Sequence, residues 1–243
     1  MSLHARGAYL DKEEIGVRKE RTVIFDLDGT LIDSLDSIRR SLNRTLTEWN
    51  FAPLSRAQVQ AFVGNSSRFL VQQALRAQKQ PSRILSETEA EALLQAYNAD
   101  YYADPLPGTR IYEGIPALLQ ELSDAGLFLA VLSNKPDAIA QRVVEGLFPG
   151  RFDAVVGFRE SVARKPAPDS LDLLCKAQQR NKDKLLYVGD TEVDAELGAR
   201  AAVRTVLVSY GFRTTEQLAD CPCAALLDSV AALRSELAEW RGE

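Results

Sequence analysis

Histidine is almost missing from this chain of 243 residues, which contains a single one, His4. A Ser-His-Asp triad, a Cys-His pair and a histidine-ligated zinc site all need an imidazole beside the reacting atoms. His4 stands in a charged stretch, residues 1–20, that is expected to be a flexible tail. Any catalysis by this chain therefore has to use carboxylates, lysine, hydroxyl groups and a hard metal ion.

Cysteine is also scarce, with only Cys175, Cys221 and Cys223 in the chain. Their odd number and spacing match neither a disulfide framework nor the paired ligand groups of a zinc site. Free thiols are typical of a reducing compartment, so we expect a cytoplasmic protein. No apolar run is long enough for a membrane helix, and the N-terminal stretch lacks the apolar segment of a signal peptide.

An excess of basic residues is missing too, because 29 lysines and arginines stand against 34 acidic residues. Proteins that bind nucleic acids usually show a basic footprint, so neither a nucleic acid nor a membrane is expected as a partner. The chain is 46% hydrophobic and 26% charged, which is ordinary for a soluble globular protein. Its length fits one large domain or two unequal ones.

Against these absences, one segment stands out. Residues 26–30 read Asp-Leu-Asp-Gly-Thr and directly follow the apolar run at 23–25. Two carboxylates about 4 Å apart repel each other by roughly 4 kcal/mol at an effective dielectric constant near 20. Asp and Gly are also common turn residues, but an EF-hand loop is excluded because Ser37 occupies its twelfth position. A bound divalent cation and a reaction that uses a carboxylate would offset the repulsion.

Short apolar runs alternate with helical patterns over the second half of the chain. Strands are predicted at residues 22–28, 127–133, 154–157, 185–189, 205–209 and 224–227. Helices are predicted at 113–125, 137–147, 168–179, 192–202, 215–219 and 229–240. This alternation predicts the α/β class, with a doubly wound parallel sheet covered by helices on both faces.

Only helical patterns occur between the first strand and residue 108. They cover residues 35–49, 55–62, 68–77 and 88–101, with breaks at 64–66 and 79–82. The predicted organisation is therefore an α/β core made of residues 21–34 and 109–243. An all-helical cap domain, residues 35–108, is inserted into that core.

Polar side chains end or follow several of the predicted strands, whose carboxyl ends meet at one edge of a parallel sheet. These residues are Asp26, Asp28, Ser133, Asn134, Asp190 and Asp194, with Lys165 between the third and fourth strands. Each has an ordinary alternative, as a helix cap, a surface lysine or an acid in a first helical turn. Their joint placement favours one shared site.

These motifs resemble those of the haloacid dehalogenase (HAD) superfamily of phosphohydrolases. Residues 26–31 resemble its first motif, Ser133 its second, Lys165 its third, and Asp190 with Asp194 its fourth. The nearest resemblance is to the phosphoglycolate-phosphatase-like members, which carry a small helical cap. Arg164 replaces a frequent glycine of the family, and residues 64–66, Gly-Asn-Ser, depart from a frequent Gly-x-Gly. The second departure leaves the substrate open, because the cap usually sets selectivity.

The resemblance implies a magnesium-dependent phosphatase that hydrolyses a small-molecule phosphate monoester, phosphoglycolate-like or a sugar phosphate. Asp26 would attack phosphorus to form an aspartyl-phosphate, and Asp28 would serve as acid and then base. Mg2+ would be held by Asp26, the backbone carbonyl of Asp28, and Asp190, with Asp194 orienting a metal-bound water.

The resemblance also implies the residues that bind the substrate. The phosphoryl oxygens would be bound by Ser133, Asn134 and Lys165, with Thr30 ordering the first motif. We further predict that Arg68, after the break at 64–66, binds a substrate carboxylate from the cap.

Other functions remain open at this stage. A phosphomutase shares the chemistry of Asp26, and a receiver-like phospho-acceptor module would be phosphorylated there without turnover. A halide-releasing dehalogenase is disfavoured, because such relatives lack the second acid of the first motif, here Asp28. The oligomeric state, monomer or homodimer, is not determined by these patterns.

Overall fold

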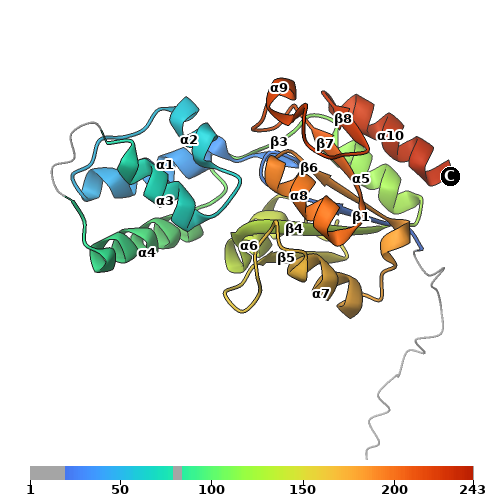
Figure 1. The fold of residues 1–243 in the computed structure, drawn as a ribbon, viewed down its shortest axis with the longest axis horizontal. Coiled ribbons are helices and arrows are strands. Elements are labelled where there is room, and N and C mark those ends of the chain that lie inside the picture. Colours follow the sequence, from blue (N-terminus) through green and yellow to red (C-terminus); the bar gives the residue numbers. More distant parts are fainter. Residues whose placement is uncertain (1–19, 79–83, 243) are drawn as a thin grey trace, which may run out of the picture.

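A computed structural model describes residues 20–78 and 84–242, and within them six parallel strands form one sheet (Figure 1). The sheet has the order β5-β4-β1-β6-β7-β8. Its strands are β1 (Thr22–Phe25), β4 (Phe128–Pro136), β5 (Ala154–Phe158), β6 (Leu185–Gly189), β7 (Arg204–Val208) and β8 (Ala225–Leu227). The predicted tail lies outside the described residues except for Glu20, and so does the whole of the predicted break at 79–82.

Helices cover both faces of the sheet, which confirms the predicted doubly wound α/β fold. One face packs against α5 (Ile115–Asp124), α6 (Asp137–Leu147) and α10 (Val230–Gly242). The other face packs against α7 (Asp169–Ala177) and α8 (Glu192–Ala201), with the short α9 (Thr215–Leu218) beside α8. In the part of the chain that the structure describes, no helix is long and apolar enough to cross a membrane.

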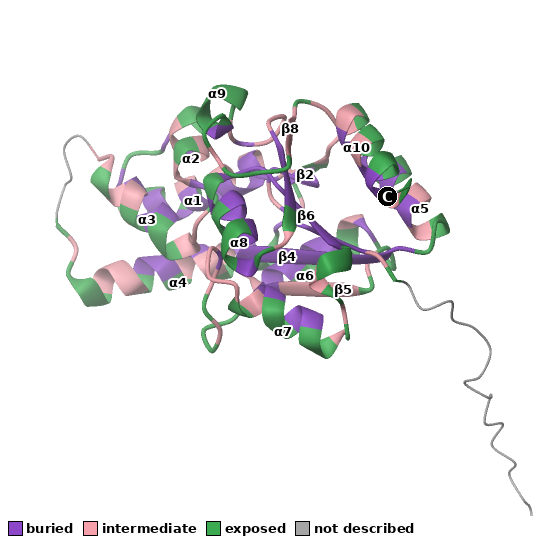
Figure 2. Cartoon of the chain, turned by 45° about the vertical axis from the view of Figure 1, so that its right-hand side comes forward, coloured by how far each residue is buried: buried purple, intermediate pink, exposed green. Residues whose placement is uncertain are grey.

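The central strand β1 shows why its sequence forms a buried strand. Val23 and Phe25 point into the core shared with α5, α6 and α10, while Ile24 points to the opposite face. Successive side chains of a strand alternate between faces, so a strand buried on both sides must be apolar throughout. All three side chains are fully buried, and the sheet is the most buried part of the molecule (Figure 2).

Between β1 and the second half of the core, the chain forms the helical insertion, which consists of α1 to α4. Its helices are α1 (Leu35–Glu48), α2 (Arg56–Phe62), α3 (Ser67–Arg76) and α4 (Glu87–Ala103). Ser55 and Ser86 begin α2 and α4 with capping boxes, in which their side chains and those of Gln58 and Glu89 satisfy the first backbone N–H groups. The predicted helical character of this segment is confirmed.

A short antiparallel pair, β2 (Ile32–Asp33) with β3 (Arg110–Ile111), joins the insertion to the core. The sequence analysis missed it, because two residues per strand are too few to show an alternating pattern. The first predicted strand also ends earlier than expected, at Phe25, since Gly29 donates to the carbonyl of Ile32 and closes a turn. The strand predicted at 127–133 instead continues to Pro136 as β4.

One arginine of the core holds the insertion in place. The guanidinium of Arg213 donates to the backbone carbonyls of Gln60 and Val63 at the end of α2, at 3.3 and 3.0 Å. The side chain of Gln60 donates in return to the carbonyl of Phe212, at 3.0 Å. Arg213 is also paired with Glu192 of α8 at 3.0 Å, and only 11% of its side chain is exposed. These contacts cap the free carbonyls of α2 and attach the insertion to the core.

Replacing Arg213 should therefore loosen the insertion without unfolding the sheet. For Arg213→Ala we expect the free energy of unfolding to fall by about 1–3 kcal/mol, because hydrogen bonds from a charged, mostly buried donor are lost. Amide hydrogen exchange should increase at residues 59–66. Arg200→Ala is the control, since Arg200 is half exposed and pairs with exposed Glu196 on the same helix. Exchange at 59–66 that stays at the wild-type rate would contradict this role of Arg213.

Candidate active site

The carboxyl ends of β1 and β6, neighbours in the sheet, carry the two acidic segments of the sequence. Asp26 directly follows β1, and Asp190 directly follows β6. The backbone N–H of Asp26 donates to the carbonyl of Val188 at 2.8 Å, so strand pairing continues into the site. One carboxylate oxygen from each of Asp26, Asp190 and Asp194 lies within 4.8 Å of the other two. The fold thus brings together acids that are up to 168 positions apart, the separation of 26 and 194.

Lys165 lies at the centre of these acids. Its ammonium nitrogen donates to Asp26 Oδ1 and Asp194 Oδ1, both at 2.8 Å, and to the hydroxyl of Tyr187 at 2.9 Å. Three acceptors satisfy the three N–H groups of a lysine that is only 3% exposed. Tyr187, which comes from β6, donates its own hydroxyl hydrogen to Asp194 at 2.7 Å. The sequence analysis did not anticipate Tyr187, which was indistinguishable from an ordinary core residue of its strand.

The charges of this network shift one another's pKa values. Burial raises the pKa of Asp26 to about 6, although the ammonium of Lys165 opposes the rise. Burial also acts to raise the pKa of Asp194, but Lys165 and the hydrogen bonds of Thr191 and Tyr187 outweigh it and hold that pKa below its usual value. Burial acts to lower the pKa of Lys165, and the carboxylates of Asp194 and Asp26 outweigh it, so the lysine stays charged.

Asp194 is saturated with protein donors. Besides Lys165 and Tyr187 on one oxygen, the other oxygen accepts from the backbone N–H of Thr191 at 3.1 Å and from its hydroxyl at 2.7 Å. Thr191 is the N-cap of α8, so this capping box also fixes the position of the carboxylate. Asp194 therefore orients Lys165, while the predicted role at a metal-bound water stays a prediction.

Asp190 is the carboxylate that most needs a cation. It is fully buried, and its hydrogen-bond donors are the backbone N–H of Phe212, at 2.8 Å, and the hydroxyl of Thr30, at 3.3 Å. Burial, with the nearby charges of Asp26 and Asp194, raises the pKa of Asp190 well above its usual value. A hard divalent ion bound by oxygen ligands would remove this penalty. The residues present therefore fit a hard divalent cation such as Mg2+, for which Asp26 and Asp190 would be carboxylate ligands.

Gly29 allows the first motif to approach Asp190. Its φ angle is +90°, in the left-handed region, and a Cβ atom there would lie 2.0 Å from Asp190 Oδ2. Any other residue would collide with the carboxylate as well as strain the backbone. The glycine turn thus serves the packing of the site.

Asp28 points away from this cluster toward the helical insertion. Its carboxylate accepts from the hydroxyl of Ser34 at 2.5 Å and from the ammonium of Lys135 at 2.7 and 2.8 Å. Lys135 also donates to the hydroxyl of Tyr101, on α4, at 2.7 Å. The sequence analysis assigned no role to Lys135. The signal that could have indicated a role is the position of this lysine, which continues a buried apolar strand.

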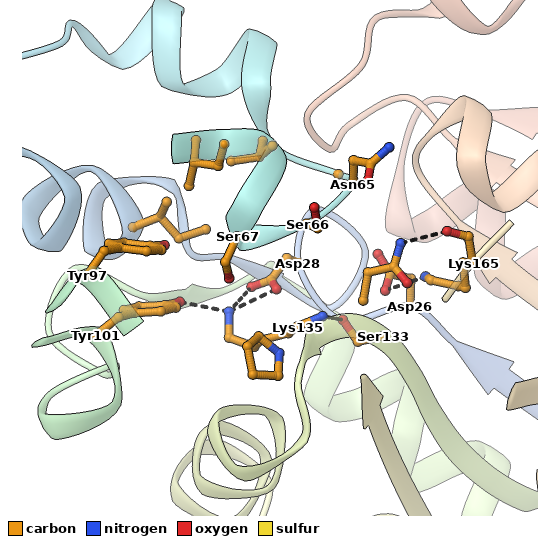
Figure 3. Close-up of a pocket in the computed structure, with 16 residues that line it drawn as sticks. Asp26, Asp28, Asn65, Ser66, Ser67, Tyr97, Tyr101, Ser133, Lys135 and Lys165 are labelled. Carbon is orange, nitrogen blue, oxygen red and sulfur yellow. Dashed lines mark hydrogen bonds and ion pairs between the residues drawn. The ribbon is translucent and has the colours of Figure 1, made fainter. Parts of the chain in front are cut away.

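A cavity of about 70 Å³ lies between the sheet edge and the insertion (Figure 3). The core lines it with Asp26, Asp28, Ser133, Asn134, Lys135, Pro136 and Lys165. The insertion lines it with Ile38, Val63, Gly64, Asn65, Ser66, Ser67, Leu70, Tyr97 and Tyr101. The side-chain amide of Asn134 donates to the carbonyl of Lys165 at 3.0 Å, and the hydroxyl of Ser133 accepts from the N–H of Lys135 at 3.3 Å.

Arg68 and Thr30, which the sequence analysis also assigned to the site, are not among the described residues that line this cavity. Arg68, on α3, is about half exposed and pairs with Glu91 of α4 at 2.5 Å. Thr30 is fully buried behind Asp190, and its backbone carbonyl accepts from the hydroxyl of Tyr210 at 2.9 Å. Thr30 thus orders the turn of the first motif, and binding of the substrate by Arg68 stays a prediction.

Known proteins share both the sequence and the fold of this chain. The family model described as haloacid dehalogenase-like hydrolase matches residues 23–208. A phosphoglycolate phosphatase from Rhodospirillum rubrum is 37% identical over 226 residues, which cover 91% of each chain. A phosphoglycolate phosphatase from Aquifex aeolicus is 29% identical over 222 residues, 90% of this chain and 100% of that one.

Among solved structures, a predicted phosphoglycolate phosphatase from Haemophilus somnus superposes with a TM-score of 0.83 at 26% identity. That alignment covers 91% of this chain and 100% of the other. The matched family model spans the first motif, the lysine and the acidic segment after β6, together with the helical insertion between them. The chain therefore belongs to the haloacid dehalogenase-like hydrolases and is similar to the phosphoglycolate phosphatases among them.

Proposed function

We propose that this protein is a magnesium-dependent phosphatase that hydrolyses a small phosphate monoester through an aspartyl-phosphate on Asp26. The observation that carries the proposal is the contact of Lys165 with Asp26 at the edge of the sheet, next to Asp190. A carboxylate, an ammonium group and a place for a divalent cation, all within a few ångströms, are the parts that phosphoryl transfer needs. Bound Mg2+ would supply charge stabilisation for the phosphoryl oxygens.

In the first step, a carboxylate oxygen of Asp26 attacks phosphorus, and the bond between phosphorus and the ester oxygen breaks. Asp28, which lies two residues further on and reaches into the same cavity, donates a proton to the departing alcohol oxygen. Lys165 and the hydroxyl of Ser133 contact the phosphoryl oxygens, whose negative charge they stabilise. The product of this step is an aspartyl-phosphate and a free alcohol.

In the second step, water attacks the phosphorus of the aspartyl-phosphate. Asp28, now ionised, removes a proton from the water, while the bond between phosphorus and Asp26 breaks. Inorganic phosphate leaves, and both carboxylates return to their starting states. No histidine among the described residues could take this part, since the one histidine of the chain, His4, lies outside them.

The insertion covers the side of the cavity where the leaving group would lie. We propose that residues 35–108 act as a cap domain that closes the cavity over the substrate and excludes water. Ile38, Leu70 and Tyr97 of the insertion line the cavity, so the leaving alcohol has to fit against these side chains. The relatives in Rhodospirillum rubrum and Aquifex aeolicus are phosphoglycolate phosphatases, which favours phosphoglycolate or a similar ester here.

The nucleophile can be tested directly. Asp26→Asn should lower magnesium-dependent release of phosphate from p-nitrophenyl phosphate by about 10³-fold or more, because an amide does not form the covalent intermediate. Rapid acid quenching of the wild-type enzyme with ³²P-labelled substrate should trap a phosphoenzyme that Asp26→Asn does not form. Unreduced turnover by Asp26→Asn would remove Asp26 as the nucleophile.

The same assay separates the alternative functions. A phosphatase releases many equivalents of phosphate per enzyme, whereas a receiver-like module would be phosphorylated once and then stop. A phosphomutase would return the label to a second hydroxyl of the substrate instead of releasing it as phosphate. Absence of multiple turnover across a panel of phosphate esters would contradict the proposed function.

Binding of Mg2+ should depend on pH, because protons compete for its carboxylate ligands. The raised pKa values of Asp26, about 6, and of Asp190 favour protonation in the metal-free protein. The stability that protonated Asp26 contributes is therefore present at low pH and is lost as the pH rises through about 6, and that of Asp190 is lost as the pH rises through its own raised pKa. We expect the apparent affinity for Mg2+ to fall at least tenfold per pH unit below 6, because each protonated ligand must lose its proton.

Thermal unfolding measures this linkage. At a concentration 100 times its Kd at pH 7.5, Mg2+ should stabilise the protein by about 2.7 kcal/mol at that pH. The same concentration of Mg2+ should stabilise it much less at pH 5, where the Kd is higher. Asp190→Asn should abolish most of the stabilisation at pH 7.5. An equal effect of Mg2+ on the melting temperature at both pH values would contradict these ligands.

A further inference from the structure

Lys135 is a buried ammonium group that the steps above do not use. Its side chain is only 4% exposed, and its nitrogen donates to both oxygens of Asp28 and to the hydroxyl of Tyr101. The nitrogen also lies 4.7 Å from the centroid of the Tyr101 ring. Burying a charged lysine is unfavourable unless it is paired, and replacing such a pair with apolar residues is often neutral or stabilising. A charged lysine buried at this place is therefore a candidate for a functional role.

The cavity has two cationic ends. Lys135 and Lys165 are the cationic side chains among its described lining residues. Lys165 lies beside Asp26, where the phosphoryl group must be for the attack. Lys135 lies on the other side of Asp28, facing Tyr101 of the insertion (Figure 3). The leaving alcohol has to extend from the ester oxygen toward Lys135, because Asp28, which must reach that oxygen, lies next to Lys135.

From these positions we propose that Lys135 binds an anionic group of the leaving alcohol, and so selects phosphate esters that carry a carboxylate close to the ester oxygen. The proposal rests on the proposed phosphatase function and names the residue that sets its substrate class. It makes Lys135 a substrate-binding residue, with Tyr101 as the residue that positions it.

Distances limit how far the carboxylate can be from the ester oxygen. The ammonium nitrogen is 2.7–2.8 Å from the oxygens of Asp28. Those oxygens must come within about 3 Å of the ester oxygen to transfer a proton. The ammonium therefore stands within about 6 Å of the ester oxygen. A carboxylate separated from that oxygen by a single carbon can reach Lys135 at this range, where it would replace one Asp28 oxygen as the acceptor of an N–H group.

Tyr101 links this recognition to the insertion. It lies on α4, while Lys135 lies on β4 of the core, so the anion site is complete only when the two are in contact. Burial raises the pKa of Tyr101 well above its usual value, so its hydroxyl keeps its hydrogen. The neutral phenol can accept from Lys135 without adding a negative charge next to Asp28. The ring of Tyr97 stacks on Tyr101, with their centroids 5.9 Å apart, and holds it in place.

The test compares two esters of similar size, 2-phosphoglycolate and ethyl phosphate, of which only the first has an anionic leaving group. For Lys135→Met, which keeps an unbranched side chain, we expect the ratio of the two kcat/KM values to fall at least 30-fold from the wild-type ratio. Most of the loss should appear as a higher KM for 2-phosphoglycolate, because a binding contact is removed. Tyr101→Phe keeps the ring and should lower the ratio about 3- to 10-fold.

Other outcomes would overturn the proposal. If Lys135→Met slows both esters equally, the lysine only positions Asp28 and binds no substrate anion. If Arg68→Ala lowers the ratio and Lys135→Met does not, Arg68 binds the carboxylate instead. Wild-type turnover of ethyl phosphate without a preference for 2-phosphoglycolate would overturn the inference while leaving the phosphatase function intact. Failure of the wild-type protein to hydrolyse either ester or p-nitrophenyl phosphate would instead contradict the phosphatase function itself.

Discussion

The balance of buried charge at the carboxyl edge of the sheet is the constraint on which this structure depends. Lys165 donates to Asp26 and Asp194, and Lys135 donates to Asp28, so each ammonium group is paired in the interior. Among the described residues Asp190 has no ammonium partner, and burial together with the charges of Asp26 and Asp194 raises its pKa. With all four carboxylates ionised against two lysines, the site carries two excess negative charges, which one divalent cation would neutralise.

The core and the insertion contribute differently to this site. The core supplies the rigid part, since β1 and β6 hold Asp26 and Tyr187 through a parallel sheet buried on both faces. The insertion supplies Tyr101 and the apolar wall opposite, and its attachments to the core include Arg213, the contact of Arg142 with the carbonyl of Tyr102, and the antiparallel pair of β2 with β3. Most residues for the chemistry therefore sit at the edge of the buried sheet, while Tyr97 and Tyr101, which face the leaving group, sit on the insertion.

Much of this arrangement was predictable from local patterns. The alternation of apolar strands and amphipathic helices indicated the doubly wound sheet, and the run of helical patterns without a strand pattern before residue 108 indicated the insertion. Acids directly after predicted strands pointed to a shared edge, where Asp26 and Asp190 indeed lie together. The predictions failed where the signal was short or ambiguous. The antiparallel pair of β2 and β3 at the base of the insertion is too short to show a periodic pattern. Lys135 lies beyond residue 133, where the polar residues suggested that the strand ends.

The sequence by itself determined which residue types are available for chemistry, because with one histidine the carboxylates and lysines are what remain. It also determined the order of strands and helices, since side-chain periodicity is a local property of the chain. Only the tertiary structure decided which acid each lysine pairs with, placing Lys165 on Asp26 and Lys135 on Asp28. Those partners are 139 and 107 residues apart, and no local pattern reports a contact that arises when strand ends meet across a sheet.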